Sequence, residues 1–92
     1  MLYYSTKSLL SGILQSLERT NDIAWDDHIE SGKECLYEMF QMIGPGVTVT
    51  AEVPVFKSLN TAIPHVKSML KAIRNQDRAT AVEHGKAAFA AM

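Results

Sequence analysis

Apolar residues recur at intervals of three and four positions along most of the chain. The first such group is Leu9, Leu10, Ile13, Leu14 and Leu17. This spacing places side chains on one face of an α-helix. The pattern therefore predicts an amphipathic helix from about Thr6 to Arg19, with Ser5 or Thr6 as its N-cap.

A second amphipathic pattern follows a polar break. Its apolar positions are Trp25, Ile29, Gly32, Leu36, Met39, Phe40 and Ile43. Asn21 or Asp22 suits the N-cap, because both side chains can accept hydrogen bonds from free backbone N–H groups. Gly44 followed by Pro45 is typical of a helix end. The sequence thus predicts a second helix that ends at Gly44.

A third pattern continues in phase across a proline. Its apolar positions are Leu59, Ile63, Val66, Leu70 and Ile73. We expect one helix from about Pro54 to Asn75, kinked just before Pro64, because proline lacks the N–H of the helical hydrogen bond. The alternative is a new helix that begins at Pro64, where proline is well tolerated.

The last segment, from about Arg78 to the end, is rich in alanine, which has the highest helix propensity. Asn75 or Asp77 is the expected N-cap. Residues 17–33 and 70–86 also resemble each other, with leucine aligned on leucine and Gly-Lys on Gly-Lys. Both segments have the pattern of a helix, a polar turn and a second helix, as two similar helical hairpins would, but with so few identities chance explains the weak repeat better.

Residues 44–56 differ from the rest of the chain, because Val47, Val49, Ala51 and Val53 alternate with polar residues. Such alternation of β-branched residues is typical of a strand. A single strand has no partner in this chain and leaves backbone groups unpaired. Two interpretations remain open: an extended crossover that lies over the bundle, or a strand that pairs with the same segment of a second chain.

Together these patterns predict an all-α protein, a single helical domain over residues 1–92. We expect a four-helix bundle-like fold of two helical hairpins joined by a long extended crossover with room for a short strand. A length of 92 residues fits one domain, and 47% hydrophobic residues suffice for a core.

Composition limits the cellular compartments and the classes of binding partner that we expect. The net charge of −1 disfavours a general polyanion binder. A lone cysteine, Cys35, cannot form an internal disulfide and favours the reducing cytoplasm. We expect neither a signal peptide nor a membrane span, since the apolar cluster near the N-terminus is short and interrupted. The sequence therefore predicts a cytoplasmic protein with no membrane partner.

Two charged stripes have comparable length. The acidic stripe is Asp26, Glu30, Glu34 and Glu38, and the basic stripe is Lys67, Lys71, Arg74 and Arg78. They are either two solvated faces, or they meet between neighbouring helices or across a subunit interface, where they would fix orientation more than stability. The basic stripe has no aromatic residue between its members, so we expect no nucleic-acid partner.

No pattern indicates catalysis or a cofactor. The chain contains no nucleophile elbow and no phosphate-binding loop. His28, His65 and His84 each belong to a different predicted helix, and no two share the spacing of a helical metal site. We therefore expect no enzyme, no cofactor and no metal.

The function that remains is protein–protein interaction, in a small intracellular regulator, adaptor or immunity-type protein. The predicted interaction residues are the two charged stripes together with Val47 and Val49. Because the stripes and the alternating segment lack obvious partners in one chain, the sequence predicts a homodimer. The alternative function is a helical bundle that binds a small molecule or a metal.

Overall fold

In the computed structural model, residues 2–43 and 53–92 are described, and of residues 53–56 only the backbone. These residues form four helices: α1 (Leu2–Arg19), α2 (Trp25–Ile43), α3 (Val53–Arg74) and α4 (Arg78–Ala91). The described ranges contain no strand, which confirms the all-α class. The predicted extended crossover with Val47 and Val49 lies outside them. Val53, expected to end the alternating run, instead begins α3.

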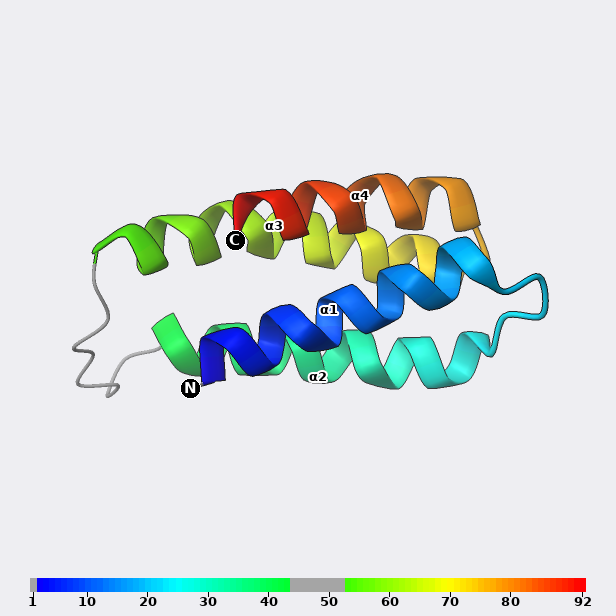
Figure 1. Ribbon diagram of the computed structural model, residues 1–92, viewed down its shortest axis with the longest axis horizontal. Helices are drawn as coiled ribbons and strands as arrows, with labels where there is room; N and C mark the ends of the chain where they lie inside the picture. Colours follow the sequence, from blue (N-terminus) through cyan, green and yellow to red (C-terminus); the bar gives the residue numbers. More distant parts are fainter. Residues whose placement is uncertain (1, 44–52) are drawn as a thin grey trace.

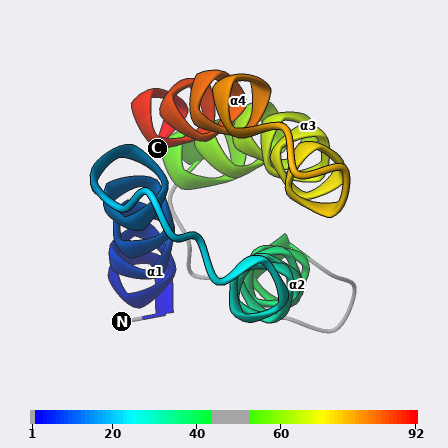
Figure 2. The same cartoon turned by 90° about the vertical axis from the view of Figure 1, so that its right-hand side faces the viewer.

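Consecutive helices run antiparallel along the 41 Å length of the molecule (Figure 1). Seen end-on, the helices follow one another around a common centre (Figure 2). Each helix contacts the two beside it, so that α1 packs on α2 and α4, and α3 packs on α2 and α4. The predicted hairpins are therefore α1 with α2 and α3 with α4. Helices α2 and α4 also begin at Trp25 and Arg78, at the same offset as Leu17 and Leu70 in the weak repeat.

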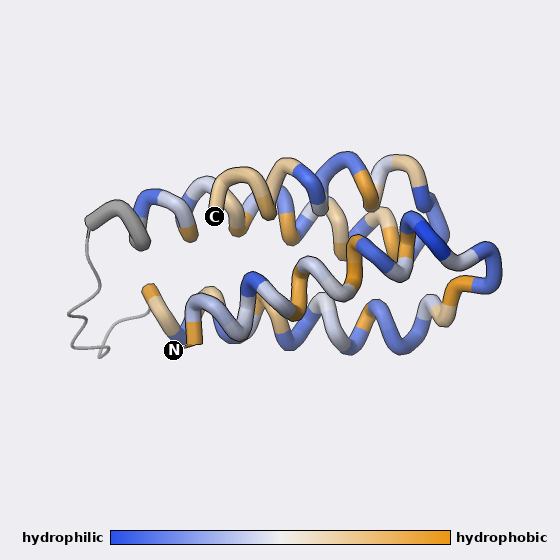
Figure 3. Tube along the Cα trace, in the orientation of Figure 1, coloured by the Kyte–Doolittle hydropathy of each residue, from blue (hydrophilic) through white to orange (hydrophobic). Residues whose placement is uncertain are grey.

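The core fills the space enclosed by the helices. Apolar and polar positions alternate along each helix at helical intervals (Figure 3). The largest fully buried side chains include Leu10, Leu17, Met39, Leu59, Met69 and Ile73. From α4 only small residues are buried, namely Ala81, Gly85 and Ala88. Small side chains let α4 approach α1 and α3 closely. This short distance between helices compensates for the smaller contact area of each side chain.

The first helix begins earlier than predicted, so the expectation of an N-cap at Ser5 or Thr6 is wrong. Thr6 lies inside the helix and is fully buried. Its hydroxyl oxygen is 2.8 Å from the Leu2 carbonyl and 2.8 Å from Oε1 of Glu38. The physical reason for the extra turn is Tyr3, whose side chain is buried in the core and is stabilised by helical placement.

The start of α2 also differs from the prediction. The helix begins at Trp25, so neither Asn21 nor Asp22 is its N-cap. The first helical bond is accepted by the carbonyl of Ala24 from the N–H of His28, at 3.1 Å. Ile23 packs against the core and holds the preceding residues as a linker instead of a helical turn. At the other end, α2 is described as far as Ile43, and the predicted helix end at Gly44 lies outside the described residues.

Helix α3 continues through Pro64, so the alternative of a new helix at Pro64 is wrong. The missing N–H leaves the carbonyl of Asn60 without its helical donor. Both Asn60 and Pro64 are exposed, so water can satisfy that carbonyl. The proline is tolerated because it lies on the solvent side of the helix; the kink stays a prediction.

The turn between α3 and α4 combines two capping motifs. The N–H of Asp77 bonds the Ala72 carbonyl at 2.8 Å, and the N–H of Gln76 bonds the Ile73 carbonyl at 3.0 Å, which is the Schellman pattern. Asp77 then caps α4, as predicted, by accepting the N–H of Thr80 at 3.3 Å. The hydrogen bonds from Thr80 lower the pKa of the Asp77 carboxyl.

Replacing Gln76 by glycine is expected to stabilise the protein by about 0.5–1 kcal/mol. Gln76 occupies the left-handed position of the Schellman motif with φ of 55°, where a side chain is strained and glycine is not. The matched control is Gln15→Gly, at an exposed position inside α1, which should cost about 1 kcal/mol. Urea denaturation measures both; equal losses in the two variants would show that the turn has no such strain.

Candidate functional site

The two charged stripes do not meet within one chain. Among the described residues the ion pairs are Lys33 with Glu30, at 3.4 Å along α2, and Lys86 with Glu18, at 3.5 Å between α4 and α1. Asp26, Glu30 and Glu34 are exposed on α2, whereas Glu38 faces α1 and lies beside Thr6. The described residues therefore show no ion pair between the acidic and basic stripes within one chain. The intersubunit form stays a prediction.

The basic stripe ends at Arg74. Lys67, Lys71 and Arg74 are exposed on α3, but Arg78 belongs to α4 and turns toward α1. Its guanidinium Nη2 donates a hydrogen bond to the Glu18 carbonyl at 2.8 Å. A cation is favourable at this position because free carbonyls and the helix dipole make the C-terminus of α1 negative. Arg78 thus joins two helices and is no part of a free basic face.

A groove of about 410 Å³ lies between α2 and α3. It is lined by Lys33, Leu36, Tyr37 and Phe40 of α2 and by Lys67, Leu70 and Arg74 of α3. These positions follow helical spacing, so the two helices each present one row of side chains. We call this surface the α2/α3 groove.

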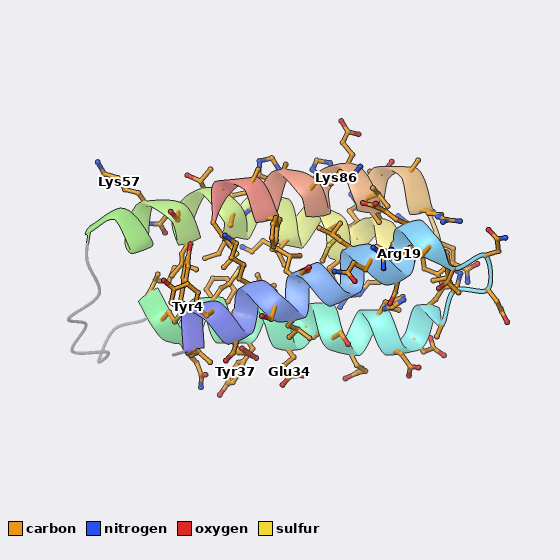
Figure 4. The ribbon with its side chains drawn as sticks, viewed as in Figure 1. Tyr4, Arg19, Glu34, Tyr37, Lys57 and Lys86 are labelled. Carbon is orange, nitrogen blue, oxygen red and sulfur yellow. The ribbon has the colours of Figure 1, made fainter. Side chains whose placement is uncertain are left out.

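The α2/α3 groove combines exposed aromatic rings with positive charge. Tyr37 is 63% exposed and Phe40 is 43% exposed. The ammonium of Lys67 lies 5.3 Å from the centroid of the Phe40 ring, within cation–π range. Tyr37 and Glu34 extend from the outer side of α2, away from the other helices (Figure 4). Tyr37 therefore lies at the outer edge of the α2/α3 groove, whereas Glu34 is not among the residues that line it.

Sequence reasoning missed this combination because it considered each helix alone. No aromatic residue lies between the basic residues of α3, but α2 supplies Tyr37 and Phe40 from across the helix contact. Gly32 assists the approach of the two helices, because a Cβ atom there would lie 2.9 Å from Cδ1 of Leu70. Leu70 is buried beside the groove. Gly32, on the apolar face of α2 and opposite Leu70 of α3, was the one sequence feature that could have indicated the close approach of these two helices.

Cys35 is fully buried on α2 and is not a reactive group. Burial, together with the neighbouring Glu38 carboxylate, raises the pKa of its thiol from 9.0 to about 12. A thiol with such a pKa holds almost no thiolate at neutral pH, and the thiolate is the nucleophile. This agrees with a structural role for Cys35 in the core.

The raised pKa of Cys35 predicts a loss of stability in alkali. In the unfolded chain the thiol releases its proton near pH 9, whereas the folded protein keeps it until about pH 12. The stabilising effect of the neutral thiol is therefore complete below pH 9 and is lost as the pH rises toward 12. Between pH 8 and pH 10 the free energy of unfolding should fall about 1 kcal/mol further in the parent than in Cys35→Ala. Urea titrations at both pH values test this, and equal slopes would contradict it.

Comparisons with known proteins give no relative. No family model matches the chain, and neither curated proteins nor solved structures yield a match. Within residues 2–43 and 53–92 there is no cluster of three or more metal-ligating side chains. In the same ranges, no helix is both long and apolar enough to cross a membrane. The functional argument therefore depends on the geometry of the α2/α3 groove.

Proposed function

We propose that this chain is a protein-interaction module that acts through the α2/α3 groove, and that the occupant of the groove is a second copy of the chain. The observation that carries the proposal is the exposed Tyr37 and Phe40 pair, framed by Lys33, Lys67 and Arg74 and flanked on α2 by acidic residues. The role is that of a small regulator or adaptor, not of an enzyme.

The aromatic pair supports an interaction surface. Single exposed apolar residues are common on proteins, but two exposed aromatic residues that line one groove are typical of interface cores. Large amphipathic rings with neighbouring basic residues are also the residue types that contribute most to binding energy. Burial against a partner would remove Tyr37 and Phe40 from water and strengthen the contact between Lys67 and Phe40.

The arrangement of charge supports a second copy as the partner. A twofold interface uses the same patch on both subunits, so the patch must be complementary to itself. Here the basic residues Lys67 and Arg74 lie on one side of the aromatic pair. Glu34 lies on the outer side of α2 (Figure 4), and Glu30, one turn earlier on the same helix, is also exposed. A twofold axis through the aromatic pair would bring the acidic side of one α2 against the basic side of the partner's α3.

Reversing one charge tests this complementarity. Lys67→Glu should weaken self-association about tenfold at low salt, since it places like charges opposite each other. Adding Glu34→Lys should restore most of the lost affinity. Sedimentation velocity over a concentration series measures both effects.

Lys57→Glu is the control for the change in net charge. Lys57 is also exposed on α3, but it points away from α2 near the start of the helix (Figure 4). Its reversal should leave association unchanged. Equal effects of the two reversals, or no rescue by Glu34→Lys, would contradict the proposed interface.

A further inference from the structure

His65 of α3 and His84 of α4 face each other across the most extensive helix contact of the bundle. Their Nδ1 atoms are 3.4 Å apart, and the ring centroids are 5.7 Å apart with the planes inclined by 31°. Both side chains are half-buried. The contact joins residues of different helices, which explains why the spacing within any one helix did not reveal it.

The distance between the two nitrogen atoms suits a shared metal ion. Imidazole nitrogens bind zinc and related ions at about 2.0–2.1 Å. Two such bonds at a tetrahedral angle place the nitrogens about 3.3 Å apart, which follows from that bond length. The two Nδ1 atoms face each other nearly head-on, as in a hydrogen bond between the rings. Binding an ion beside them would therefore need rotation of the imidazole rings but little movement of α3 or α4.

We propose that His65 and His84 form a two-histidine site for a late first-row divalent ion such as Zn²⁺, Ni²⁺ or Cu²⁺. Imidazole is a common ligand for these ions, and Cu²⁺ is expected to bind most tightly. Because both rings are half-exposed, water has access to the remaining coordination positions. The bound ion holds α3 to α4, and the site does not depend on self-association.

The surrounding structure favours a preformed site. Gly85, the residue after His84, is buried where α4 approaches α1 and α3, so the backbone that carries His84 is closely packed. His65 lies next to the fully buried Val66 on α3. Rings attached to closely packed helices lose less freedom when an ion binds, which raises the affinity of a site with few protein ligands.

Thermal unfolding of the full chain with Ni²⁺ or Zn²⁺ tests the site. With free metal at about ten times the dissociation constant, the Tm should rise by roughly 6–11 °C, and EDTA should reverse the shift. Isothermal titration should give one ion per chain. His84→Gln should abolish the shift and weaken binding at least about tenfold, since one of two ligands is lost.

The matched control is His28→Gln, which removes a half-buried histidine of α2 and should keep the full shift. The same titrations on Phe40→Ser separate this site from the α2/α3 groove, because metal binding should persist when self-association is lost. An unchanged Tm with every ion, or an equal shift in His84→Gln, would overturn the proposal. If His84→Gln fails to fold, titration of His65→Gln replaces it.

Discussion

Replacing Gly85 by valine is expected to lower the free energy of unfolding by about 2–3 kcal/mol. A Cβ atom at this position would lie 2.4 Å from Cδ2 of Leu14 and 3.0 Å from the Met69 sulfur. Leu14 and Met69 are themselves buried, so neither side chain has much space to move. Overpacking of this kind typically costs about 1–3 kcal/mol, and a β-branched side chain has few alternative rotamers.

The control for Gly85→Val is Gly12→Ala. Gly12 is an exposed helical glycine, and a Cβ atom there would have no atom within 4 Å apart from the backbone of its own helix. Alanine there should stabilise α1 by about 0.5–1 kcal/mol, because it removes the backbone entropy cost of glycine. Chemical denaturation of both variants measures the difference. If Gly85→Val were as stable as the parent, the close approach of α4 to α1 would be wrong.

Phe40→Ser is expected to weaken self-association about 30-fold. Removing a central aromatic residue from an interface commonly costs about 2 kcal/mol, which corresponds to that factor. Phe40 is 43% exposed in the single chain, so its loss should change the stability of the monomer much less. Sedimentation equilibrium gives the dissociation constant, and urea denaturation of dilute protein gives the monomer's stability.

The bundle offers a close control for Phe40 in Phe89. Phe89 of α4 is 37% exposed, and the ammonium of Lys7 lies 4.9 Å from its ring centroid. The groove beside Phe89 is smaller, about 240 Å³, and Lys7 is the one charged residue that lines it. Phe89→Ser should therefore leave self-association unchanged. Equal weakening by the two variants would show that exposed aromatic residues act without regard to place.

Much of the helical framework could be predicted from periodicity, because buried positions recur at helical intervals in the described part of each helix. The apolar phase across Pro64 indicated one helix, and the acidic side chain of Asp77 indicated the cap of α4. The predicted starts of α1 and α2 were wrong because tertiary contacts of Tyr3 and Ile23 determine where these helices begin. Local capping preferences contribute only about 1 kcal/mol, so packing can override them.

The candidate sites were harder to predict, since both depend on which helices are neighbours. The stripes were visible as charges three or four residues apart, but the turn of Arg78 toward Glu18 depends on the placement of α1 beside α4. The aromatic rings of α2 and the basic residues of α3 combine only after those helices pack. In the same way, the pairing of His65 with His84 requires the α3–α4 contact.

The native mass of the parent chain, measured by light scattering at low and high salt, tests the central claim of self-association through the α2/α3 groove. We predict a dimer at low salt that dissociates more readily at high salt, because screening weakens the contacts between acidic and basic residues. A dimer insensitive to salt would point to apolar contacts or to residues 47–52, which lie outside the described ranges. A monomer at every concentration and salt would contradict the proposed interface.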